Sequence, residues 1–129
     1  MNVSHLVAWG AVLSLPAAAL LGWFLRGRSS GAFRVRMRPH FILGYAALAL
    51  ACVHLTLSMG DTGAANINGI WFAGFALAGL GVQTFVGASL QSPGSYRAPL
   101  RRWHRMLFWS VAALVLGHVF LNAPFFARS

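Results

Sequence analysis

Charged residues are scarce in this sequence of 129 residues, at 9% of the total. A soluble domain carries roughly 25% charged residues, so this chain lacks the polar surface that keeps a protein in water. Four long uncharged stretches account for the deficit. They are Leu6–Leu25, Pro39–Gly60, Thr62–Tyr96 and Met106–Ala127. Because about 20 apolar residues cross the hydrocarbon core of a bilayer, the sequence predicts an integral membrane protein.

The predicted fold class is all-α, a transmembrane four-helix bundle with up-down-up-down topology. The whole chain, 1–129, is expected to form one domain, with spans near 6–25, 40–60, 67–90 and 104–123. Short connections make neighbouring spans antiparallel, so the second and fourth spans run parallel. Residues 1–5 carry no Lys or Arg, which argues against a cleaved signal peptide and for a retained first span.

Lysine is absent, and the only acidic residue is Asp61. Nine of the ten arginines lie in two of the three connections, at Arg26, Arg28, Arg34, Arg36, Arg38, Arg97, Arg101, Arg102 and Arg105. This asymmetry predicts that both arginine-rich connections face the cytoplasm and both termini face outward. A net charge of +9 is also typical of nucleic-acid binders, but arginines between spans indicate topology, so no nucleic-acid partner is expected. Abundant Ala, Gly and Arg favour a bacterial inner membrane.

Cysteine is almost absent as well. The single residue, Cys52, lies within a span, so the chain forms no intrachain disulfide. The sequence has no Cys-x-x-Cys-His motif for covalent haem attachment and no second cysteine for an iron–sulfur cluster.

Four of the five histidines form two pairs with identical spacing. His40 and His54 lie on the second predicted span, His104 and His118 lie on the fourth, and 14 residues separate the members of each pair. Fourteen residues are two heptads, so both histidines of a pair face the same way, about 21 Å apart along the helix. Parallel spans then place His40 level with His104, and His54 level with His118. This layout would hold two bis-histidine haems stacked across the bilayer.

Small residues line the helix face between the first two histidines. Gly44, Ala47 and Ala51 lie between His40 and His54, and would leave room for a flat macrocycle. The third span also carries small residues on one face, which would permit close approach of a neighbour: Gly74, Ala78, Gly81 and Ala88. Small stripes also pack transmembrane helices without any cofactor, and a single intramembrane histidine is often a packing residue. Four histidines with equal spacing favour a functional role over packing alone, because ionisable side chains are costly inside a membrane.

The two histidine spans show a faint internal repeat at an offset of 64 residues. His40 matches His104, His54 matches His118, and Arg38 matches Arg102. Most other identities are Leu or Ala, which are common in any span, so the pattern leaves duplication and chance equally open.

Together these residues resemble the membrane-integral dihaem cytochromes b, including the haem-binding core of bc-type cytochrome b and ferric-reductase-like membrane domains. The stretch Leu100–Arg105 with its Trp-His pair, followed by Gly117-His118, carries much of the likeness, which covers essentially the whole chain. The resemblance implies two non-covalent haem b groups ligated by His40, His54, His104 and His118. The sequence shows neither the additional helices of bc-type cytochromes b nor the flavin domain of ferric reductases. The resemblance therefore leaves the electron donor and the electron acceptor open.

The arginines nearest His40 and His104 are expected to pair with the propionates of the inner haem. They are Arg38, Arg101, Arg102 and Arg105. The alternative is that they serve membrane topology alone.

Three functions remain open. The first is an electron-transfer subunit of a larger respiratory or photosynthetic complex, a component of an oxidoreductase rather than a complete enzyme. The second is a stand-alone membrane oxidoreductase linked to quinone, with quinone as a further cofactor or partner. The third is a haem-free assembly or scaffold subunit.

The predicted orientation can be tested by labelling. A cysteine placed at Ser30, in the first arginine-rich connection, should react with an impermeant thiol reagent only when the cytoplasmic side is exposed. Labelling from the outside alone would reverse the orientation.

Overall fold

The computed structural model describes residues 3–27, 32–59, 66–92, 94 and 96–122. Its helices are α1 (Val3–Arg26), α2 (Phe33–Arg36), α3 (Arg38–Ser58), α4 (Ile67–Ser89) and α5 (Arg97–Asn122). The four long ones are long and apolar enough to cross a membrane. The protein is therefore an all-α bundle and an integral membrane protein, as the sequence predicts.

The helix ends follow local chemistry. Pro39 occupies the first turn of α3, where a missing N–H costs no hydrogen bond. The side chain of Asn66 caps α4 by accepting a hydrogen bond from the backbone N–H of Asn68 at 3.0 Å. α5 begins at Arg97, earlier than the predicted span near 104, and contains Pro99 in its first turn. A helix does not stop where the apolar stretch stops, so its first turns continue into the charged connection.

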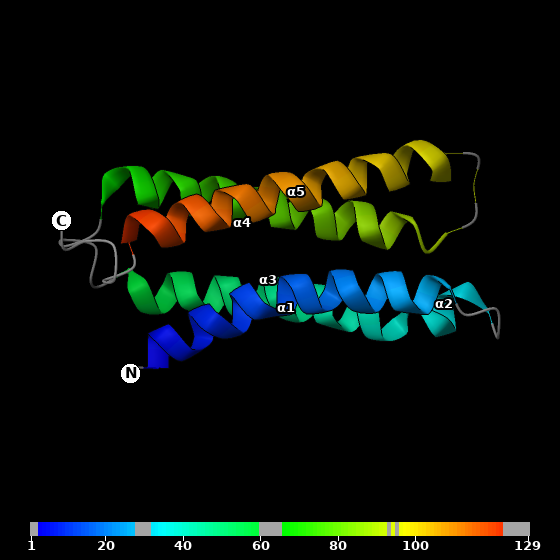
Figure 1. Ribbon diagram of the computed structural model, residues 1–129, viewed down its shortest axis with the longest axis horizontal. Coiled ribbons are helices and arrows are strands. Elements are labelled where there is room, and N and C mark those ends of the chain that lie inside the picture. The colour runs from blue at the N-terminus through cyan, green and yellow to red at the C-terminus, as the bar shows by residue number, and fades with distance from the viewer. Residues whose placement is uncertain (1–2, 28–31, 60–65, 93, 95, 123–129) are drawn as a thin grey trace.

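The long helices form two antiparallel hairpins. α1 packs along α3, α4 packs along α5, and contact between the two pairs is mainly between α3 and α4. Figure 1 shows the pairs as two layers, with α2 at the end where α1 finishes and α3 begins. α3 and α5 run in the same direction, so the arginine-rich segments around α2 and before α5 share one end of the bundle. This end is called the arginine end below.

The protein core is a thin layer at mid-height of the bundle. Ala47 and Val111 are each only 1% exposed, and Leu80 packs with them. Leu15, Leu48, Ala51 and Val115 complete the layer. Ala47 lies seven residues from each histidine of α3, and Val111 lies seven from each histidine of α5. The core therefore separates two histidine levels.

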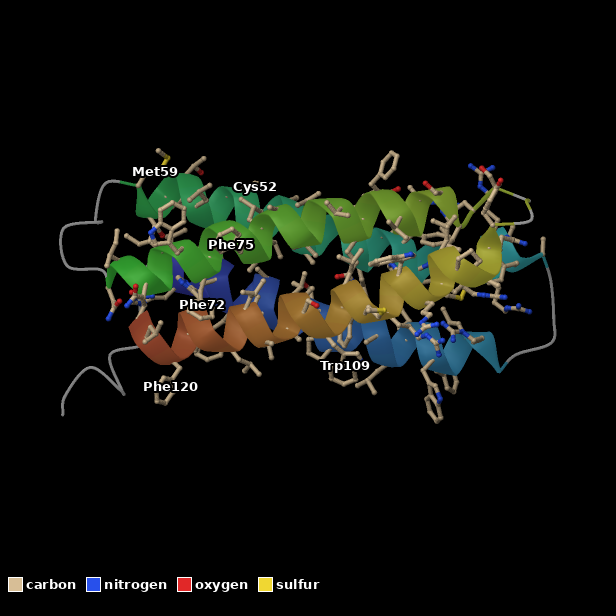
Figure 2. The ribbon with its side chains drawn as sticks, turned by 90° about the horizontal axis from the view of Figure 1, so that it is seen from above. Cys52, Met59, Phe72, Phe75, Trp109 and Phe120 are labelled. Carbon is tan, nitrogen blue, oxygen red and sulfur yellow. The ribbon has the colours of Figure 1, made fainter. Side chains whose placement is uncertain are left out.

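The outer surface of the bundle is apolar. Trp109 is 71% exposed and Phe120 is 61% exposed, and Figure 2 shows both pointing away from the other helices. Large exposed apolar side chains are unfavourable in water and suit contact with lipid tails. The lipid bilayer is thus the environment of these four helices.

The central layer predicts a sharp contrast between two alanines of α3. Ala47→Leu should lower the free energy of unfolding by about 1–3 kcal/mol, because a larger side chain has no room at a site that is 1% exposed. Ala49→Leu, on the exposed side of the same helix, should change it little. Unfolding in detergent followed by circular dichroism measures both. Equal effects would show that the layer is loosely packed.

Candidate functional site

The four histidines of α3 and α5 form two facing pairs. The ring centroids of His40 and His104 are 6.2 Å apart, with an interplanar angle of 80°. Those of His54 and His118 are 6.4 Å apart, at 68°. These are the partners expected from the 14-residue spacing and the parallel course of the two helices. The first pair lies toward the arginine end, and the second toward the other end.

Three of the four imidazoles are held by a backbone carbonyl of the helix behind them. In each bond Nδ1–H donates to an oxygen of α1 or α4, because a carbonyl oxygen can only accept. The bonds are His40 Nδ1–Ala18 O at 2.8 Å, His104 Nδ1–Gln83 O at 3.2 Å and His118 Nδ1–Gly69 O at 2.9 Å. A neutral ring protonated on Nδ1 carries its lone pair on Nε2. These three histidines are thus fixed in the tautomer that binds a metal through Nε2.

His54 is held differently. Its Nδ1 lies 3.5 Å from Oγ of Ser4 in α1 and 3.3 Å from Oγ of Ser58 in α3, and the two hydroxyls are 3.2 Å apart. A hydroxyl can donate or accept, so these contacts orient the ring without fixing its tautomer.

Two glycines open the path from imidazole to carbonyl. Gly22 lies four residues after Ala18, and Gly87 lies four residues after Gln83, so each sits beside the carbonyl that accepts the bond. A Cβ on Gly22 would lie 2.8 Å from Nδ1 of His40. A Cβ on Gly87 would lie 3.2 Å from Cε1 of His104. Absence of a side chain at both positions lets the rings reach the backbone.

The sequence analysis did not identify these two glycines. It predicted that a different face of the third span, with Gly74 and Gly81, would allow a neighbouring helix to approach closely. A Cβ at Gly74 or Gly81 would meet no atom within 4 Å. The contact face of α4 instead carries Gly69 and Gly87. Gly22 and Gly87 could have been found by looking for a glycine on one span at the same depth in the membrane as a histidine on the next span.

Buried polarity marks the first histidine level. Gln83 is 9% exposed, and its Oε1 is buried without a hydrogen-bond partner among the described residues. The same residue supplies the backbone oxygen that holds His104. A buried amide oxygen normally has a donor, so this atom has capacity for one from outside the protein.

The other predicted site residues divide into two groups. Arg38, Arg101, Arg102 and Arg105 are exposed near the arginine end, on the same helices as His40 and His104. Ala47 and Ala51 pack in or against the central layer, whereas a Cβ on Gly44 would meet no atom within 4 Å. Gly44 therefore borders free space, and the two alanines close the centre.

The two hairpins place their contact residues at equivalent positions. The offset is 64 residues from α3 to α5 and 65 from α1 to α4. It relates His40 to His104 and Ala47 to Val111, and on the backing helices it relates Ala18 to Gln83, Leu15 to Leu80, Ser4 to Gly69 and Gly22 to Gly87. The faint repeat of the histidine spans thus extends to the helices that hold them.

Each histidine level brings two imidazoles together. Among the described residues, no group of three or more His, Cys, Asp or Glu side chains could hold a metal ion.

Comparison of the chain with protein-family models, with curated proteins and with solved structures found no match.

The close contact between Gly22 and the His40 ring predicts that alanine at this position destabilises the protein, whereas Gly→Ala usually stabilises a helix. Gly→Ala in a helix normally gains about 1 kcal/mol, and Gly74→Ala, where a Cβ meets no atom within 4 Å, should follow this rule. Gly22→Ala should instead lower stability by about 1–3 kcal/mol, since its Cβ would press on the His40 ring. Thermal unfolding in detergent compares the two. Stabilisation by both substitutions would contradict the contact.

Proposed function

We propose that this protein is a dihaem b-type cytochrome that carries electrons across a membrane. The observation that best supports this proposal is the pair of imidazoles at each of two levels. Nδ1 of three of these rings donates a hydrogen bond to a backbone carbonyl. Such bonds are typical of metal-ligating histidines, where they fix the tautomer and raise the basicity of the ligating nitrogen. His40 and His104 would hold the inner haem, and His54 and His118 the outer one.

The residues present fit a haem at each level. At each level two imidazoles would supply the protein ligands of the haem iron, His40 with His104 and His54 with His118. Gly44 borders free space beside the inner pair.

Bis-histidine ligation limits the chemistry. A haem would supply one-electron redox chemistry, and with two histidines as its protein ligands it would have no open position for oxygen or substrate. The chain's own residues hold and orient the ligands: carbonyls of Ala18, Gln83 and Gly69 fix three rings, and the hydroxyls of Ser4 and Ser58 orient the fourth. Ala47, Leu80 and Val111 exclude water from the layer between the two levels.

The setting that we propose is a bacterial cytoplasmic membrane with both termini outside and the inner haem near the cytoplasm. The arginine end would then follow the positive-inside rule, and Arg38, Arg101, Arg102 and Arg105 would lie near the inner propionates. A chain with such short connections has little room for a substrate domain, which favours a subunit of a larger redox complex.

A second candidate is a quinone-linked oxidoreductase. Its specific support is the buried, unpartnered amide oxygen of Gln83, which could accept a hydrogen bond from a quinol hydroxyl. Copurification of partner subunits would favour the first candidate, and quinol oxidation by the isolated chain would favour the second.

Haem content tests the proposal directly. Pyridine haemochrome analysis of the purified protein should give close to two haem b per polypeptide, because the two imidazole pairs are equivalent in geometry. A value near zero in folded protein would leave the haem-free scaffold as the better description.

Single substitutions should remove the haems in pairs. His40→Ala and His104→Ala should each abolish the same spectral component, and His54→Ala and His118→Ala the other one. His5→Ala is the control for loss of a histidine outside the two pairs: it removes an exposed imidazole close enough to His54 to act on it electrostatically, and both components should stay present. Low-temperature reduced spectra distinguish the components, and circular dichroism reports folding. Loss of one component through His40 and His118 would overturn the assignment of levels.

A further inference from the structure

Two guanidinium groups from different connections meet over one aromatic ring at the arginine end. Cζ of Arg36 lies 6.0 Å from the centroid of the Phe33 ring, and Cζ of Arg97 lies 5.4 Å from it. Both distances refer to the same centroid, so the two carbons are at most 11.4 Å apart. Arg36 belongs to α2, before α3, and Arg97 opens α5. The cluster of Phe33, Arg36 and Arg97 therefore joins the two hairpins.

The chain has no acid with which to neutralise this pair. Its single carboxylate side chain, Asp61, falls between α3 and α4, which are joined at the opposite end of the bundle. A cation over an aromatic ring is only weakly stabilised at an exposed site. Because the sequence has no other acidic side chain, any anion that pairs with these two arginines comes from outside the protein.

The two arginine side chains of the cluster are held differently. Nε of Arg36 is buried and has no partner among the described residues. Arg97 donates one Nη2 hydrogen bond to the carbonyl oxygen of Leu90 at 3.0 Å, which fixes its side chain against the end of α4. A guanidinium has five N–H donors in a fixed fork that matches the oxygens of a phosphate.

The surroundings indicate where the anion comes from. Val35, between the two arginine-bearing turns of α2, is 71% exposed, and Phe33 is 38% exposed. Exposed apolar side chains beside cations at the end of a transmembrane bundle are typical of the membrane interface, where anionic lipids attract basic residues.

We propose that Arg36 and Arg97 bind the phosphodiester of one anionic lipid, which links the α1–α3 and α4–α5 hairpins at the arginine end. This site does not depend on the proposed function, since it involves none of the histidines.

Native mass spectrometry of the protein in detergent tests the site with phosphatidylglycerol and phosphatidylcholine as probes. The wild type should bind one phosphatidylglycerol at least ten times more tightly than phosphatidylcholine. Arg36→Gln with Arg97→Gln should remove that preference. Arg36→Gln alone, which keeps the Arg97–Leu90 hydrogen bond, should remove most of it. Arg34→Gln is the matched control: it removes the same charge from an exposed position two residues away and should change the ratio less than twofold.

Several outcomes would overturn the site. An equal loss in Arg34→Gln and Arg36→Gln would mean diffuse attraction to a basic surface. Displacement of the lipid by millimolar inorganic phosphate would mean a general anion site. A preference that appears only in the His40→Ala variant would mean that the arginines serve haem propionates instead. Circular dichroism confirms that each variant is folded before lipid is added.

Discussion

Inside a bilayer no water competes for the ring nitrogens of a histidine, and here backbone carbonyls of α1 and α4 accept Nδ1–H from three of the four paired rings. Hydrogen bonds between transmembrane helices contribute only about 0.6 kcal/mol each, so their main effect is on orientation rather than stability. They fix the tautomer, aim the free nitrogen away from the backing helix and set the height of α1 against α3 and of α4 against α5. Small residues at Gly22 and Gly87 follow from the same requirement.

The four long helices have two different tasks in the bundle. α3 and α5 present the imidazoles, and α1 and α4 hold them from behind. The two hairpins meet at the central layer of Ala47, Leu80 and Val111, where side chains fill the interior. Above and below that layer the imidazole pairs take the place of a continuous apolar core. A cofactor at each level would therefore complete the packing as well as supply the chemistry.

Much of this organisation is encoded in patterns that a single sequence displays. Four apolar stretches predict four helices, and the 14-residue spacing of the histidines predicts which rings share a level. The backing carbonyls could not be predicted, because the height of α1 relative to α3 depends on packing that periodicity does not report. Gly22 and Gly87 are hidden among fourteen glycines, and Gly74 and Gly81 look equally suited to close approach. The start of α5 at Arg97 could not be predicted either. The length of an apolar stretch indicates which residues lie inside the bilayer, but the helix continues beyond them.

The repeat between the hairpins has a consequence for how the protein is made. Every Nδ1 contact described for α3 comes from α1 or from α3 itself, and those of His104 and His118 come from α4 and α5. Each hairpin is thus a finished half-site as soon as its own two helices have inserted. During synthesis the first half can adopt its final geometry before the second leaves the ribosome. Assembly then becomes the docking of two preformed halves, with the order of insertion built into the order of the chain.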